Sequence, residues 1–170
     1  MDLTVESRST SAAIGTVANF PPGVANEISA ALTNLLADVF TSYLKTKNFH
    51  WHMSGRHFRD YHLMLDEQAD QVFAMVDAVA ERCRKIGGRT IRSVGEISRR
   101  QRLKDSDAMD LSPGAMLSEP QSDNRRLLEF LRDLHVFCEK HEDVASASVL
   151  ENWIDEAEGR IWFLFEAVCD

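Results

Sequence analysis

Apolar residues recur at steps of three and four residues along four long stretches of this chain, and that spacing predicts amphipathic helices. The first stretch is typical, with apolar side chains at Ile28, Leu32, Leu35, Val39 and Tyr43. Asn26 is a plausible N-cap for this helix, which we expect to run to about His50. Ser54 and Gly55 then provide a break before the next helix.

A second long helix is predicted from about Arg56 to Ile86, where Gly87–Gly88 forms a left-handed C-terminal stop. The connection that follows is long. Ser93–Glu96 has the Ser-x-x-Glu pattern of a capping box, which predicts a short helix inside this connection. The connection then continues through the polar segment Lys104–Asp110.

Two further helices are predicted in the C-terminal half. Ser112 and Pro113 match an N-cap followed by proline at the first helical position. Pro120 should kink or break a helix that begins there, so we expect the main third helix at residues 121–140. The fourth helix is predicted at residues 143–168. Four long helices without a convincing strand predict an all-α fold, a four-helix bundle with a long crossover between its second and third helices.

Composition divides the chain into a tail and one domain. Residues 1–23 are rich in Ser, Thr and Ala and end in Pro-Pro-Gly, so we expect a mobile N-terminal tail. Residues 24–170 then form the bundle. The 19 Lys and Arg against 27 Asp and Glu give a net charge of −8, a field that attracts cations and repels nucleic acid.

Neither cysteine spacing nor hydropathy indicates an exported or membrane protein. The 3 cysteines show no Cys-x-x-Cys spacing, and an odd number argues against a disulfide framework. Cys83, on the second predicted helix, is expected to be buried and reduced. No apolar run approaches the roughly 20 residues of a membrane span. We therefore expect a cytoplasmic protein without a membrane partner.

Candidate metal ligands concentrate between the first two predicted helices. They are His50, His62, Asp66, Asp77 and Glu81. The last four form two pairs at i,i+4, which share a helix face. Imidazole and carboxylate without thiolate suit iron, manganese or zinc. The alternative is that these acids and histidines only decorate a solvated helix.

The spacing of the two pairs limits how they could bind one ion. Asp66 and Asp77 are 11 residues apart, roughly 16 Å along a helix, whereas metal–oxygen bonds are about 2 Å long. Both pairs nevertheless face nearly the same way, because 11 residues is close to three helical turns. If the helix met its own copy antiparallel across a two-fold axis, the two halves would meet and form two symmetric sites.

Several motifs together resemble one known family, the Dps proteins, which are mini-ferritins named as DNA-binding proteins from starved cells. The resemblance covers about residues 24–167. Its motifs are KNFHW at Lys47–Trp51, G-x-x-F-x-x-x-H-x-x-L-D at Gly55–Asp66, D-x-x-A-E-R at Asp77–Arg82, Gly87–Gly88, and RIWFLFE at Arg160–Glu166.

The resemblance implies a ferritin-like bundle and a ferroxidase, an oxidoreductase that converts Fe(II) to Fe(III). His50, His62 and Asp66 match ligands from one subunit, whereas Asp77 and Glu81 match ligands from its two-fold partner. The family usually uses hydrogen peroxide and stores ferric mineral in a hollow dodecameric shell, which protects against oxidative stress. The implied substrate and stored metal is iron, and the implied partner is the chain itself as a homo-oligomer.

The resemblance also suggests roles for residues outside the ligand set. Trp51 would give up an electron near the iron site, although on base rates it is a packing aromatic. Dps shells admit Fe(II) through acidic three-fold pores. Asp143, Glu151 and Asp155 could line such a pore here, or they could simply form a solvated helix face with favourable charge at its N-terminus.

Two rival functions remain open. One is a DNA-compacting stress protein with a vestigial metal site, and the other is a structural bundle whose acids are only solvated. DNA binding is not expected through the tail, because residues 1–20 carry only Asp2, Glu6 and Arg8 as charged residues and no lysine. No glutamate is followed three residues later by histidine, so the intrabundle di-iron motif Glu-x-x-His is absent from the sequence.

Overall fold

The computed structural model describes residues 20–169, so most of the tail predicted at residues 1–23 lies outside the described part. Its helices are α1 (Pro22–His52), α2 (Phe58–Lys85), α3 (Val94–Arg100), α4 (Pro113–Lys140) and α5 (Val144–Val168). The described residues contain no strand, which confirms the all-α prediction. None of these helices is long and apolar enough to cross a membrane.

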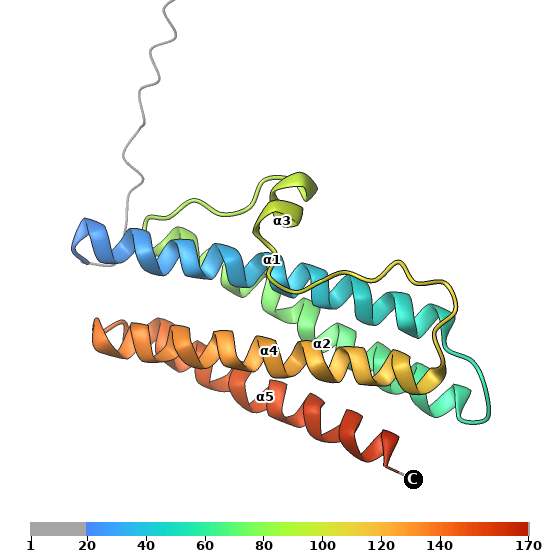
Figure 1. The fold of residues 1–170 in the computed structure, drawn as a ribbon. Helices are drawn as coiled ribbons and strands as arrows, with labels where there is room; N and C mark the ends of the chain where they lie inside the picture. Colours follow the sequence, from blue (N-terminus) through green and yellow to red (C-terminus); the bar gives the residue numbers. More distant parts are fainter. Residues whose placement is uncertain (1–19, 170) are drawn as a thin grey trace, which may run out of the picture.

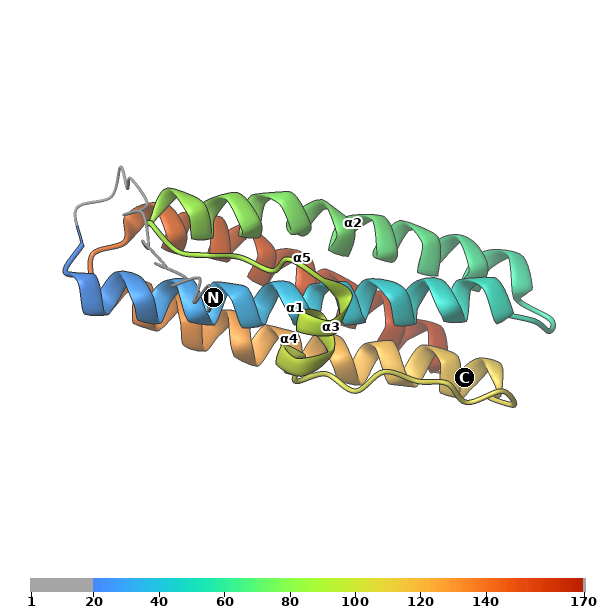
Figure 2. The ribbon, with the colours of Figure 1, turned by 90° about the horizontal axis from the view of Figure 1, so that it is seen from above.

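The four long helices lie side by side as two antiparallel pairs, α1 with α2 and α4 with α5 (Figure 1). The pairs pack through α1 against α4 and through α2 against α5. Viewed from above, the crossover from α2 to α4 runs along the outer side of α1 and carries the short helix α3 (Figure 2). This is the predicted four-helix bundle with an extra helix in its crossover.

Helix α1 begins earlier than the sequence predicted. Its first residue is Pro22, and Asn26 lies one turn inside it. Proline is well suited to the first helical turn, because its missing N–H would have no helical partner there. Phe20 packs partly buried against the core, so the folded region extends into the segment assigned to the tail.

The predicted break at Pro120 is wrong, because α4 is continuous from Pro113 to Lys140. A proline inside a helix costs about 3 kcal/mol relative to alanine. Buried side chains on both sides offset that cost, with Leu117 in one hydrophobic cluster and Leu127 in the other. The N-terminus of α4 is capped by Ser112, whose Oγ accepts a hydrogen bond from the backbone N–H of Ala115 at 3.2 Å. Tertiary packing therefore overrides the local preference.

The predicted stop at the C-terminal end of α2 and the predicted cap of α3 are confirmed, whereas α2 begins at Phe58 rather than at about Arg56. Gly87 adopts a φ of +88°, and the N–H of Gly88 donates to the Cys83 carbonyl at 2.9 Å, as in a Schellman motif. A Cβ on Gly88 would lie 2.3 Å from the Cβ of Ser29, so α2 ends in tight contact with α1. Ser93 caps α3 by accepting from the N–H of Glu96.

The bundle interior contains two hydrophobic clusters with polar residues between them. The larger cluster occupies the end where α2 terminates, and the smaller one occupies the end with the α1–α2 loop. In each long helix, the residues between the two clusters include a buried polar side chain. Helix α4 contributes two such residues and each of the other long helices one. We call these five residues the polar layer: Lys45, Gln68, Asp123, Asn124 and Arg160.

Candidate metal centre

His50 and His62 hold each other in one orientation. The Nδ1 atom of His50 lies 2.8 Å from the His62 carbonyl oxygen, and the Nδ1 atom of His62 lies 2.8 Å from the His50 carbonyl oxygen. The rings stack with centroids 3.7 Å apart. A carbonyl only accepts, so each Nδ1 carries the proton and each Nε2 keeps a free lone pair. Each carbonyl therefore fixes the tautomer and the orientation of the ring, and histidines that bind metals in other proteins are often held in the same way.

Asp66, the third predicted ligand on this side, lies beside His50. Its Oδ1 lies 3.7 Å from the Nε2 of His50, so the carboxylate and the imidazole are close enough to share one ion. The ammonium of Lys47 also contacts Oδ1, and this hydrogen bond lowers the pKa of Asp66 below its ordinary value. The carboxylate therefore stays ionised, while the lysine competes with any cation that binds there.

Asp77 and Glu81 lie on the same helix but away from these three residues. Both are exposed, and Glu81 forms an ion pair with Lys85 at 2.9 Å. Within the part of the chain described here, no group of three or more His, Cys, Asp or Glu side chains is arranged to hold a metal. His50 thus lies near both His62 and Asp66 without these three forming a metal-binding group in the described subunit, and the second predicted pair lies apart.

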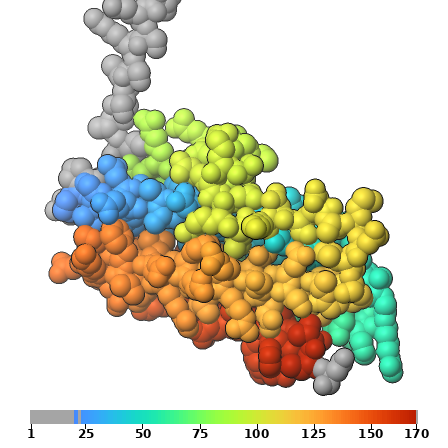
Figure 3. Space-filling view, in the orientation of Figure 1, coloured from blue at the N-terminus to red at the C-terminus, as the bar shows by residue number. Residues whose placement is uncertain are grey.

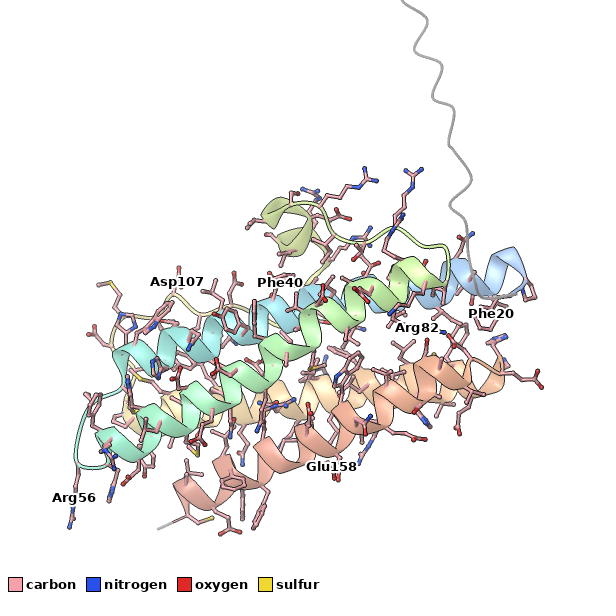
Figure 4. The ribbon with its side chains drawn as sticks, turned by 180° about the vertical axis from the view of Figure 1, so that it is seen from behind. Phe20, Phe40, Arg56, Arg82, Asp107 and Glu158 are labelled. Carbon is pink, nitrogen blue, oxygen red and sulfur yellow. The ribbon has the colours of Figure 1, made fainter. Side chains whose placement is uncertain are left out.

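Trp51 lies next to His50 in sequence but is 60% exposed, which does not match a packing aromatic within the subunit. It borders a groove of about 950 Å³ between α1 and the crossover, together with His52 and Met109. Figure 4 shows Phe40 on α1 and Asp107 on the crossover, both of which line this groove. The tryptophan ring is therefore accessible beside the candidate ligands.

The three predicted pore residues occupy different environments. Asp143 is buried as the N-cap of α5, and its carboxylate accepts from Ser146 and pairs at 2.5 Å with Arg82, which Figure 4 labels on α2. Glu151 and Asp155 are exposed on α5. Glu151 lines an open depression of about 810 Å³ with Glu139, Glu142 and the first residues of α5.

Two contacts near these sites were missed by sequence reasoning. Lys47 precedes the Dps-like histidine by three residues, and nothing in that spacing indicates its contact with Asp66 on another helix. His135 lies between Glu139 and Glu151, at 3.5 and 3.2 Å, on the rim of the acidic depression. The i,i+4 spacing of His135 and Glu139 was a usable signal.

The comparisons with known proteins agree with the fold and the motifs. A ferritin-like domain family matches residues 29–168. The chain is 30% identical over 148 residues to an uncharacterized low temperature-induced protein of Nostoc, covering 84% of this chain and 82% of the relative. It is 26% identical over 143 residues to DNA protection during starvation protein 1 of Deinococcus radiodurans, covering 84% and 69% respectively.

Solved structures give the same assignment. An archaeal Dps homologue from Halobacterium salinarum superposes with a TM-score of 0.87 at 25% identity, covering 97% of this chain and 93% of that one. The Dps of Thermosynechococcus elongatus gives a TM-score of 0.84 at 23% identity. Family match, sequence relatives and shared fold lead to one conclusion: the chain belongs to the ferritin-like family and, within it, to the Dps proteins.

Proposed function

We propose that this protein is an iron-storage and detoxification mini-ferritin that oxidises Fe(II) at sites shared between two subunits. The observation that carries the proposal is the paired histidine geometry. His50 and His62 each place a proton on Nδ1 and leave Nε2 free, and Asp66 lies beside His50. Two imidazoles and a carboxylate suit an iron substrate.

Asp77 and Glu81 would supply the other half of each site from the two-fold partner. They share a helix with Asp66 at roughly three turns' distance, so an antiparallel partner brings them opposite the histidines. Additional carboxylates favour the product Fe(III), because its higher charge is stabilised more strongly by anionic oxygen ligands. Oxidation would thus be driven by ligands that become complete only on assembly.

We propose hydrogen peroxide as the oxidant, as in similar proteins. One peroxide accepts two electrons, one from each of two Fe(II), and becomes two waters when two protons are supplied. Trp51, exposed beside the site, would donate an electron when only one Fe(II) is present and so limit radical escape. The ferric product would be stored inside a closed shell of twelve subunits in the cytoplasm.

Fe(II) would enter the shell through acidic openings. Asp143 already uses its carboxylate oxygens within the subunit, so the proposal rests mainly on Glu151 and Asp155. Glu139 and Glu142 line the same depression as Glu151 and extend the negative surface. Grouped carboxylates raise the local concentration of divalent cations at such an opening.

A pair of complementary variants tests the shared site. The first, His50→Ala with His62→Ala, removes the histidine half, and the second, Asp77→Ala with Glu81→Ala, removes the carboxylate half. Each alone should lose fast Fe(II) oxidation, because every site then contains one broken half. After random co-refolding, about half of the two-fold pairs are mixed, and about a quarter of all sites regain both intact halves.

Subunit exchange must be measured by mass spectrometry in the same samples. Mixed pairs without recovered oxidation would refute the interfacial site. Full activity in either variant alone would refute the ligand assignment. Titration with redox-inert Co(II) separates loss of binding from loss of oxidation, and wild-type protein that fails to bind Co(II) would instead favour a purely structural bundle.

A second candidate function is DNA binding through the last turn of α2 and the first part of the crossover. Residues 82–104 contain nine of the chain's 19 Lys and Arg but only one of its 27 Asp and Glu, a net charge of +8 in a chain of −8. All nine except Arg82 are exposed. Figure 3 shows the crossover covering one side of the bundle, and nitrogen-tipped side chains extend outward from it in Figure 4. Such clustered cations bind phosphate backbones by releasing counterions.

Gel shifts with duplex DNA at two salt concentrations, in the presence of chelator, test this candidate. Replacing two crossover residues, Arg92→Gln and Arg99→Gln, should lower the salt dependence by about two units of log K per log salt. Replacing Arg56 and Arg125, which are exposed outside the crossover, is the matched control. Equal losses from both pairs, or no binding by wild type at about 0.15 M salt, would refute the candidate.

A further inference from the structure

The polar layer contains buried groups without partners inside the subunit. Arg160 is 2% exposed, and its Nε donates to the Oδ1 of Asn124 at 2.7 Å. Its two terminal amino groups, Nη1 and Nη2, have no hydrogen-bond partner among the described residues. The same is true of Nε2 of Gln121, which lies one turn before Asn124 on α4, and of Oε1 of Gln68.

These groups come from three helices, and hydrogen bonds join Arg160 to Gln68 and to Asn124. Gln68 on α2 donates through Nε2 to the backbone carbonyl of Arg160 on α5 at 3.3 Å. Asn124 and Gln121 share a face of α4, because residues three apart are neighbours on a helix surface. Elsewhere in the described chain, Thr90 Oγ1 is the one other buried polar side-chain atom without a partner, because Asp123 Oδ2 lies 2.8 Å from the ammonium of Lys45. The unmet hydrogen-bonding capacity is therefore concentrated in one place.

The charges of the polar layer do not balance. Lys45 lies 2.8 Å from Oδ2 of Asp123 and 3.9 Å from Glu119, so its ammonium has carboxylate partners. Arg160 has no carboxylate within ion-pair distance among the described residues, and Glu156, one turn earlier on α5, is exposed. Burial lowers the pKa of Arg160 to about 10, which still leaves it protonated at neutral pH. An unpaired buried cation is strongly unfavourable.

We propose that the polar layer and the adjoining Gln121 bind one small monovalent inorganic anion of the halide type, held by the terminal amino groups of Arg160 and the amide N–H groups of Gln121. The unmet groups are mainly donors, and a halide accepts from several donors without needing an acceptor in return. A water molecule would satisfy hydrogen bonds but would leave the charge of the guanidinium unmatched. An anion does both.

The proposed site is chemically the reverse of an intrabundle di-iron centre. Other ferritin-like proteins place glutamates and Glu-x-x-His motifs inside the bundle to bind metal cations. In this chain Lys45 and Arg160 place positive charge in the bundle interior, which repels Fe(II). The anion would link α4 to α5 through Arg160 and would leave the iron chemistry to the subunit interface. The inference does not depend on the proposed ferroxidase activity.

Thermal unfolding of the full assembled protein tests the site. Chloride or bromide is compared with gluconate, which is too large for a buried site, at constant ionic strength. A halide at about one hundred times its Kd should make unfolding about a hundredfold less favourable. Arg160→Met, which removes the buried charge and keeps an unbranched side chain, should abolish the difference between anions. Arg126→Met changes an exposed arginine and should retain it.

Crystals of the wild-type protein grown in bromide provide a test that needs no variant. An anomalous peak within hydrogen-bond distance of Nη1 or Nη2 of Arg160 is expected. Water alone at this position in saturating bromide would overturn the proposal. Equal halide dependence in the wild-type protein and Arg160→Met, or none in the wild type, would overturn it as well, even if the variant itself is less stable.

Discussion

Asp38 should be one of the most sensitive positions in the chain, because it attaches the crossover to the bundle. The side chain is fully buried on α1. Its Oδ1 accepts from the backbone N–H groups of Arg102 and Leu103 at 2.5 and 3.1 Å. Its Oδ2 accepts from Nε and Nη2 of Arg102 at 2.8 and 2.7 Å. One carboxylate thus fixes the backbone at the end of α3.

Asp38→Ala should destabilise the protein by about 2–4 kcal/mol, because two backbone donors lose their acceptor and each unmet buried donor costs about 1–3 kcal/mol. The guanidinium of Arg102 contributes less to the loss. It is 38% exposed and can turn to water, although it also stacks 3.6 Å from the ring centre of Phe130. For a chain of this length the melting temperature should fall by about 4–16 °C.

Hydrogen exchange distinguishes this mechanism from general destabilisation. In Asp38→Ala the amides of α3 and of Arg102 and Leu103 should lose protection first, while those of α4 and α5 stay protected. Asp133→Ala, an exposed aspartate on α4, is the matched control. A melting temperature equal to that of the control, or uniform loss of protection along the chain, would refute the assigned role of Asp38.

Three further changes have defined outcomes. Gly88→Ala should cost about 1–3 kcal/mol in thermal unfolding, because the new methyl group collides with α1. Burial raises the pKa of Cys138 to about 12, so a thiol reagent should label the exposed Cys169 and spare Cys138, and stability should fall as pH rises above 9.0, where the thiol ionises only in unfolded chains. Lys47→Met should tighten Co(II) binding about two- to fivefold in calorimetry, because the competing ammonium is removed from Asp66. Unchanged affinity would refute this last prediction.

Helix number and order were predictable, because a repeated three- and four-residue apolar spacing depends only on which face meets the core. The end of α2 was predictable for a similar local reason, since the left-handed conformation found at Gly87 is one that glycine adopts without steric cost. Pro120 was not predictable. Whether a proline breaks a helix depends on how much apolar surface is buried on both sides of it, and that surface is defined by other helices.

The candidate site was predictable at the level of residue identity but not of contact. Spacing placed His62 and Asp66 on one face, and residue type alone made His50 a candidate. The reciprocal bonds between the two histidines and the contact of Lys47 with Asp66 join α1 to α2. Such contacts depend on how the two helices pair in three dimensions, which i,i+4 patterns along a single helix do not describe.

The net charge of the whole chain differs from the charge of its individual segments. The net charge of −8 indicated repulsion of nucleic acid, yet residues 82–104 carry +8, which leaves −16 on the rest of the chain. At physiological salt the Debye length is about 8 Å, so surface charges farther apart than this act nearly independently. A bundle helix of 25 residues, the length of α5, spans about 37 Å. The proposed entry of Fe(II) at acidic side chains and the proposed binding of phosphate by residues 82–104 would therefore depend on the local charge of each surface rather than on the total.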